Sequence, residues 1–174
     1  ARLPRWTLDL PSSLPESHPS TAGMMLNRID ARLGELRIAG QSFPNVMLQA
    51  RHEPEGLHIE LDGKTLAGRV HAPDQPTPEQ PVNITLSRLY LRRAGEGAVT
   101  DQTEPDPRRL PPLVLTADDV RLNEAALGRL RLTALPRPDD ARRIELDLRS
   151  DQQQISANGE WRRTPGGQAS RLQA

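Results

Sequence analysis

The sequence predicts an all-β protein: an antiparallel meander of repeated strand units, curled into an open groove or incomplete barrel with little helix. Two observations predict this fold. Apolar and polar residues alternate with a period of two along most of the chain, which is typical of strands with one apolar face. Apolar patterns also recur at a constant spacing of 84 residues, as from Leu36 to Val120, which indicates one multi-strand unit used twice.

The alternation and the proline content divide the chain into four parts. Residues 1–24 form an irregular, Pro-rich lead-in with a possible strand, and residues 25–73 form the first β repeat unit. Residues 74–112 hold Pro-rich loops that flank a strand segment, because proline restricts the backbone and removes hydrogen-bond donors. Residues 113–174 form the second repeat unit, truncated at the C-terminus. We interpret the chain as a segment of a longer protein, since it begins without Met or a signal peptide.

Each repeat unit contains a hairpin whose register can be predicted. A turn at Gly63-Lys64 suits type II′ geometry and collects the apolar side chains on one face. Its expected pairs are Leu61 with Leu66, Ile59 with Gly68, and Leu57 with Val70. A turn at Asp151-Gln152 does the same in the second unit. Its expected pairs are Leu148 with Ile155, Leu146 with Ala157, and Ile144 with Gly159.

Residues 117–134 fit two structures. The segment Thr116-Ala-Asp-Asp119 resembles a helix capping box, and the residues after it tolerate a helix. Apolar residues nevertheless step by two on each side of a break, at Leu113 and Leu115 and then at Val120 and Leu122. We expect a strand with a bulge, with helix as the alternative.

The composition gives little support to several function classes. Lys and Arg number 23 and Asp and Glu number 23, so no net positive charge favours nucleic-acid binding. There is no Cys, which excludes zinc thiolates and thiol catalysis. No apolar run approaches the 18 residues of a transmembrane helix. Only four residues are aromatic, fewer than a compact core of this size normally uses.

Polar residues do not assemble into a recognisable catalytic, cofactor or metal site. The four His lack metal-ligand spacing, and we expect His58 to lie at the surface across from Arg69. The acid pairs Asp118-Asp119 and Asp139-Asp140 are interpreted as turn residues. Arg doublets begin at positions 92, 108, 142 and 162, and we expect them at solvated strand ends. We therefore expect a non-enzymatic protein without cofactors or metals.

Several segments together resemble the repeat of large AsmA-like proteins of the YhdP type, which are related to TamB. The resemblance covers roughly residues 25–172, and the Gly159-Glu-Trp161 ending is its most distinctive part. The segments that carry it are Pro111–Leu122, Leu127–Ala134, Ile144–Leu148, Ile155–Trp161 and, more loosely, Leu57–Pro73.

The resemblance implies a bridge-like lipid transfer protein: a long β-groove, anchored in the inner membrane of Gram-negative bacteria, that crosses the periplasm. Its apolar interior would conduct phospholipid between the inner and outer membranes. The implied partners are phospholipid acyl chains, neighbouring repeats of the same full-length chain, and membranes through an anchor absent from this sequence. The alternative is a structural or protein-interaction β domain of an envelope scaffold with an ordinary closed core.

If the apolar face forms a groove, matched positions of the two units should line this groove as one continuous strip. Their neighbours along the strands should face water; these are His58, Glu60, Arg69, Glu145 and Asp147. The expected lining residues are Leu57, Ile59, Leu61, Leu66, Val70, Ile144, Leu146, Leu148, Ile155 and Ala157.

Overall fold

The computed structural model describes residues 28–38, 40–93, 110–137, 141–164 and 167–173, and all regular secondary structure in these residues is β-strand. The lead-in expected at 1–24, Asp139-Asp140 and the Arg doublet at 108 lie outside them. The ten strands are β1 (Arg28–Ile38), β2 (Gln41–Glu53), β3 (Gly56–Asp62), β4 (Leu66–Ala72), β5 (Val82–Leu91), β6 (Leu113–Leu122), β7 (Ala125–Pro136), β8 (Arg142–Arg149), β9 (Gln154–Thr164) and β10 (Gly167–Gln173).

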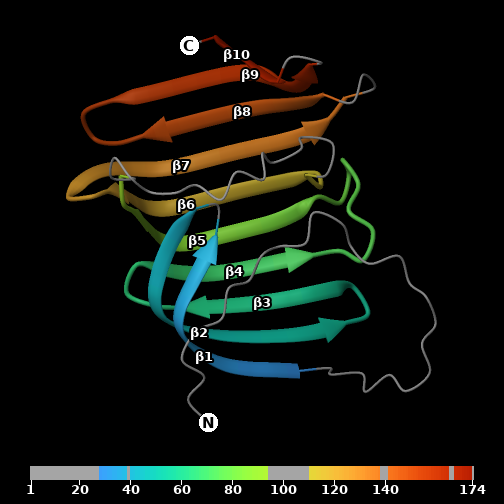
Figure 1. Ribbon diagram of the computed structural model, residues 1–174, viewed down its shortest axis with the longest axis vertical. Coiled ribbons are helices and arrows are strands. Elements are labelled where there is room, and N and C mark those ends of the chain that lie inside the picture. The colour runs from blue at the N-terminus through green and yellow to red at the C-terminus, as the bar shows by residue number, and fades with distance from the viewer. Residues whose placement is uncertain (1–27, 39, 94–109, 138–140, 165–166, 174) are drawn as a thin grey trace.

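The strands form one sheet in sequence order, from β1 at one edge to β10 at the other (Figure 1). Because β1 and β10 do not pair, the sheet stays open, which confirms the predicted fold class. One pairing differs from the prediction: β5 and β6 run parallel, while every other neighbouring pair is antiparallel. Residue alternation is the same in parallel and antiparallel strands, so the sequence pattern did not indicate this exception.

The second hairpin has the predicted register, and the first does not. In β8–β9, Leu146 lies opposite Ala157 and the two other expected pairs also form. In β3–β4, Ile59 lies opposite Val70 and Leu61 opposite Gly68, so the predicted register is wrong by two residues. The turn lies one residue later than predicted, centred on Lys64 and Thr65. Because side chains alternate between faces with a period of two, this shift changes the partners and keeps every residue on its expected face.

The strand prediction for residues 117–134 is confirmed. Strands β6 and β7 pair across this segment, with register irregularities between Ala117 and Val120 and between Val120 and Arg121, where the break was expected. Leu33 pairs with Val46 in the first unit, and Ala117 pairs with Leu130 in the second, so the first two strands of each unit share one register.

The β1–β2 hairpin leaves the sheet halfway along its length. The ladder between β2 and β3 ends at Met47 and Asp62, and β2 residues before Met47 pair only with β1. At the departure point, Asn45 adopts a φ of 52°, and the Gly34–Asn45 pair is missing from the ladder. We call residues 35–38 and 41–46 the lid, because they cross over β3 to β5 on one side of the sheet (Figure 1).

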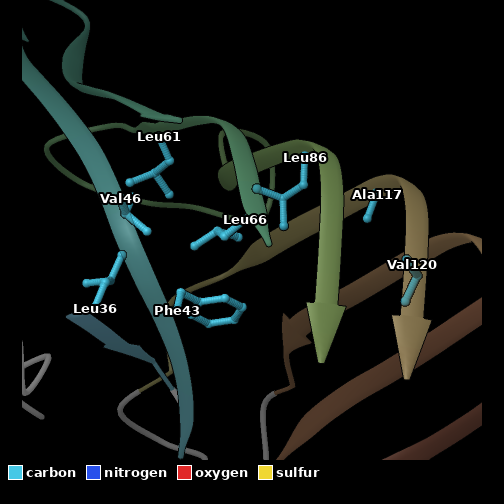
Figure 2. Packing of buried hydrophobic residues seen from close by; sticks show 8 residues of the cluster. All are labelled: Leu36, Phe43, Val46, Leu61, Leu66, Leu86, Ala117 and Val120. Atoms are coloured by element: carbon cyan, nitrogen blue, oxygen red, sulfur yellow. The ribbon is translucent and has the colours of Figure 1, made fainter. Parts of the chain in front are cut away.

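The core lies between the lid and the sheet. Figure 2 shows Leu36, Phe43 and Val46 of the hairpin facing apolar side chains of the sheet. Those sheet residues come from four strands, β3 to β6, and are Leu61, Leu66, Leu86, Ala117 and Val120. Every member of this cluster is at most 8% exposed. Folding the hairpin over therefore buries apolar side chains of β3 to β6, which favours the folded arrangement.

Arg142 fixes the segment before β6 to the start of β8. Its side chain is buried rather than solvated, so the surface position predicted for Arg142 is wrong, whereas Arg143 of the same doublet is exposed. Its Nε and Nη2 donate hydrogen bonds to the Leu110 carbonyl oxygen at 2.9 and 2.8 Å. The Val82 amide bonds to the Pro112 carbonyl oxygen at 2.8 Å, which secures the same segment to β5. A buried guanidinium is tolerated here because carbonyl acceptors replace water.

Gly68 is required by a close approach of β4 and β5. Its φ is +150°, and a Cβ at this position would lie 2.3 Å from the Thr85 carbonyl oxygen and 2.6 Å from the Leu86 Cα. We predict that Gly68→Ala lowers the free energy of unfolding by about 2 kcal/mol or more, since backbone strain and overlap act together. Urea unfolding followed by circular dichroism measures the change.

Gly40→Ala is the matched control. Gly40 also has a positive φ, +75°, but no atom lies within 4 Å of the added Cβ. Only the conformational term acts there, so we expect a loss of about 1 kcal/mol. Equal losses in the two variants would contradict the overlap argument.

Candidate functional site

The candidate site is the apolar face of the sheet, which is organised in rows that run across the strands. Residues directly opposite each other in a ladder lie on the same face, so the pairings trace each row. The first row contains Ile29, Ala50, Ile59, Val70, Ile84, Leu115, Leu132, Leu146 and Ala157. The second contains Ala31, Leu48, Leu61, Gly68, Leu86, Ala117, Leu130, Leu148 and Ile155. Both rows cross from β1 to β9 without a charged or polar residue.

A third, shorter row lies beside the first. It contains the pair Leu57 and Ala72 in β3 and β4 and, from β5 to β9, the paired residues Val82, Leu113, Ala134, Ile144 and Gly159. Neighbouring rows are two residues apart along each strand, so three rows make an apolar band about 13 Å wide. Nine strands at the usual spacing make the two long rows about 38 Å long. The face is therefore a long apolar strip.

All ten residues predicted to line a groove lie on this face. Nine belong to the three rows, and Leu66 joins through its pairing with Leu89, which packs against the core cluster. The two predicted groups are separated by β5, β6 and β7, and residues of those strands connect them. The connecting residues that the prediction omitted show the same alternation, and they include Ile84, Leu86, Leu115, Leu130 and Leu132.

The lid divides the face into a covered part and an open part. Under the lid, Leu61 and Leu66 are 8% and 2% exposed, and Ile59 packs against their cluster. Beyond the lid, Ile144, Leu146, Leu148 and Ala157 are only partly buried. Ile155, the last residue of the second row, is 43% exposed. The lid residues themselves were missed, because nothing in the alternation shows that a hairpin bends.

The opposite face carries polar and charged side chains, including the five that the prediction turned toward water. Glu60 lies opposite Arg69, and Asp147 accepts a hydrogen bond from the Ser156 hydroxyl at 2.6 Å. His58 pairs with His71, not with Arg69 as predicted, because of the two-residue register shift. The two imidazole rings stack with centroids 4.4 Å apart. Among the described residues, no cluster of His, Asp or Glu could hold a metal ion.

A polar cluster on this second face fastens the parallel strands β5 and β6. The Tyr90 hydroxyl donates a 2.5 Å hydrogen bond to Asp119, and the Arg121 guanidinium donates to both carboxylate oxygens of Asp119. Arg121 also lies over the Tyr90 ring, 4.7 Å from its centroid. We call these three residues the clamp. Asp119 lies within β6, so its interpretation as a turn residue is wrong.

The clamp shifts the ionisation of its members. Hydrogen bonds from Tyr90 and Arg121 hold the pKa of Asp119 below its usual value. The hydrogen bond to Asp119 raises the pKa of Tyr90. The Asp119 contribution to stability is therefore present above about pH 4 and is lost as the pH falls through its lowered folded-state pKa. The Tyr90 contribution is present below about pH 10 and is lost as the pH rises through its raised folded-state pKa.

The comparisons with known proteins identify the family. The family model described as YhdP protein matches residues 3–174. The chain belongs to the YhdP family. YhdP proteins are AsmA-like proteins of the bacterial envelope, so the resemblance read from the sequence is confirmed. No curated protein and no solved structure gives a significant match. In the part of this YhdP chain that the structure describes, no helix has the length and apolarity to span a membrane.

We predict that Tyr90→Phe lowers the urea midpoint between about pH 5 and 9, because it removes the donor to Asp119 while keeping the ring beneath Arg121. As the pH falls through the lowered pKa of Asp119, the carboxylate becomes protonated and the difference from the wild-type chain should shrink. Midpoints measured across this pH range test the prediction.

The control variant is Arg28→Gln. It breaks an exposed contact between Arg28 and Asp30 on edge strand β1, where the Arg28 Nε lies 2.7 Å from the carboxylate. Exposed pairs of this kind contribute little to stability. A Tyr90→Phe loss no larger than that of the control, or one independent of pH, would contradict the clamp.

Proposed function

We propose that the apolar face of this YhdP chain binds phospholipid acyl chains. The unbroken rows are the observation that carries the proposal. A sheet with one apolar face normally covers it with another layer. Here the open part, from Ile144 to Ala157 in β8 and β9, has no described layer over it, and Ile155 stays 43% exposed. Hydrocarbon chains would remove this surface from water, which is favourable.

The proposed setting follows from the family. The chain would be one segment of an inner-membrane-anchored periplasmic protein whose groove conducts phospholipid between the inner and outer membranes. Neighbouring repeats would extend the rows on either side. The protein would act by binding and guiding lipid, without catalysis or cofactors. An apolar strip suits this task because acyl chains slide along it with no polar group to desolvate.

A second candidate is a structural or protein-interaction β domain with an ordinary closed core. The buried cluster beneath the lid favours it, since the first unit already packs like a domain interior. The two candidates differ in what touches the open part of the face: lipid in one, protein or water in the other.

Photo-crosslinking in the full-length protein in cells separates them. A photoreactive residue at Leu146 would sit on the open apolar face, and one at Glu145 would sit on the opposite face of the same strand. We expect lipid adducts at Leu146 and not at Glu145. Equal labelling at the two positions, or no lipid at either, would mean that the proposed function is wrong.

A charge substitution on the same face gives a further prediction. Leu146→Asp places a carboxylate in the hydrocarbon path, which costs several kcal/mol unless it is protonated or hydrated. Lipid adducts at a photoreactive residue in place of Ile155, on the neighbouring strand, should disappear. The fold should survive, because Leu146 is only partly buried. Asp147→Leu, on the opposite face, is the control and should leave the adducts unchanged; loss of adducts in both variants would contradict the path.

A further inference from the structure

The lid occupies the same apolar rows that are open elsewhere. Leu61, Leu86 and Ala117 belong to the second row, and they are buried against the lid cluster. Farther along the same row, Leu148 is half-buried and Ile155 is exposed. Leu36, Phe43 and Val46 of the lid therefore lie where hydrocarbon would lie if the row were occupied along its whole length (Figure 2).

The lid is attached like a hinged flap. Its base is the Gly34–Asn45 position, where the ladder is interrupted and Asn45 has a left-handed φ of 52°. Beyond that point β2 has no ladder to β3. Proline at position 44 fits a strand segment without a second neighbour, because proline cannot donate to a ladder. The backbone of the lid can thus turn about its base without breaking the hydrogen bonds of β3 to β9.

Contacts at the tip hold the flap closed. The Gln41 side-chain oxygen accepts a hydrogen bond of 3.0 Å from the Arg92 backbone amide, just after β5. Gly40, in the turn, has a φ of +75° and open space around it. Apolar contacts beneath the lid also attach it to the sheet. Local openings of a protein are expected at segments held in this way.

The corresponding hairpin of the second unit is held in the sheet. Strand β6 pairs with β5 from Val82–Leu113 to Leu91–Leu122, whereas β1 is an edge strand. The Asn123 amide bonds to the Leu91 carbonyl oxygen at 2.8 Å, and the clamp adds its side chains on the opposite face. The β6–β7 hairpin is thus fastened where the β1–β2 hairpin is free to bend.

We propose that the lid is a gate in the lipid path and that its own apolar side chains occupy the path when it is closed. Closed, its side chains fill the apolar rows between β3 and β6; open, it turns about Gly34–Asn45 and leaves those rows to an acyl chain. This inference rests on the proposed function. Lid side chains cover the apolar face in the closed state, and an acyl chain covers it in the open state, so the face stays away from water in both. Lipid that arrives along the rows therefore shifts the population toward the open state.

The first test follows lid motion without lipid. The chain has no cysteine, so a single introduced thiol reports on its own site. Leu66→Cys lies beneath the lid at a position 2% exposed. Ala134→Cys is the control, at a position 1% exposed and outside the lid cluster. We expect maleimide to label Leu66→Cys at least about tenfold faster than Ala134→Cys, because the lid opens locally. The rate at Leu66→Cys should not change in low urea, because local opening exposes little surface. Equal rates would overturn the gate.

The second test locks the lid and follows lipid. Gln41→Cys with Arg92→Cys, joined by a short cleavable thiol cross-linker, ties the tip to β5. Photoreactive residues replace Ile59, which packs against the lid cluster, or Leu146, in the open part of the same row. In membranes holding the full-length protein, locking should reduce lipid adducts at Ile59 to background and leave those at Leu146. Cleaving the linker should restore them. Each single-cysteine variant, treated identically, is the control.

The outcomes separate the two proposals. Adducts at Ile59 that are equal in the locked and cleaved states would overturn the gate and leave the lipid path standing. Adducts at Leu146 with none at Ile59 in either state would mean that the lid is a permanent cover, which also overturns the gate. If no adducts form at Leu146 in any state, the proposed lipid path is wrong, and a gate for lipid is wrong with it. The thiol-labelling result would still report whether the lid moves.

Discussion

The parallel pairing of β5 with β6 is the constraint on which the rest of the structure depends. Strands β1 to β5 form one antiparallel meander and β6 to β10 form another, and β6 begins the second by running beside β5. Ile84 faces Leu115 and Leu86 faces Ala117 across this junction, so the apolar rows of one unit continue into the next. A register change of one residue here would place the apolar sides of the two units on opposite faces.

The two units share a ladder and differ in what surrounds it. The first two strands of each have the same register, yet only β1–β2 folds over the sheet. Neighbouring strands explain the difference: β6 has β5 beside it along its whole length, and β1 lies at an edge. The same sequence pattern therefore gives a cover in one position and an open surface in the other.

Much of the fold and part of the candidate site could be predicted from the sequence. Alternation places a residue on a face, and that inference survived even where the first hairpin was wrong by two residues, because both registers keep Ile59 and Val70 on one side. Partners that depend on loop geometry were not predictable: His58 meets His71, and Arg142 binds a carbonyl oxygen 32 residues away. The bend at Asn45 was also missed, since one residue in a left-handed conformation leaves no periodic signal.

The row geometry has a consequence for how such chains can diverge. The rows depend on ladder pairing and not on the turns that join the strands, so turns can lengthen or shorten while the strip keeps its direction and width. Connections of three residues through Gly63 and of four residues through Asp151 already coexist in matched hairpins. Insertions inside a strand are not tolerated in this way, because one inserted residue moves every following side chain of that strand to the opposite face. Insertions and deletions among relatives should therefore gather in the turns, and strand lengths should be kept.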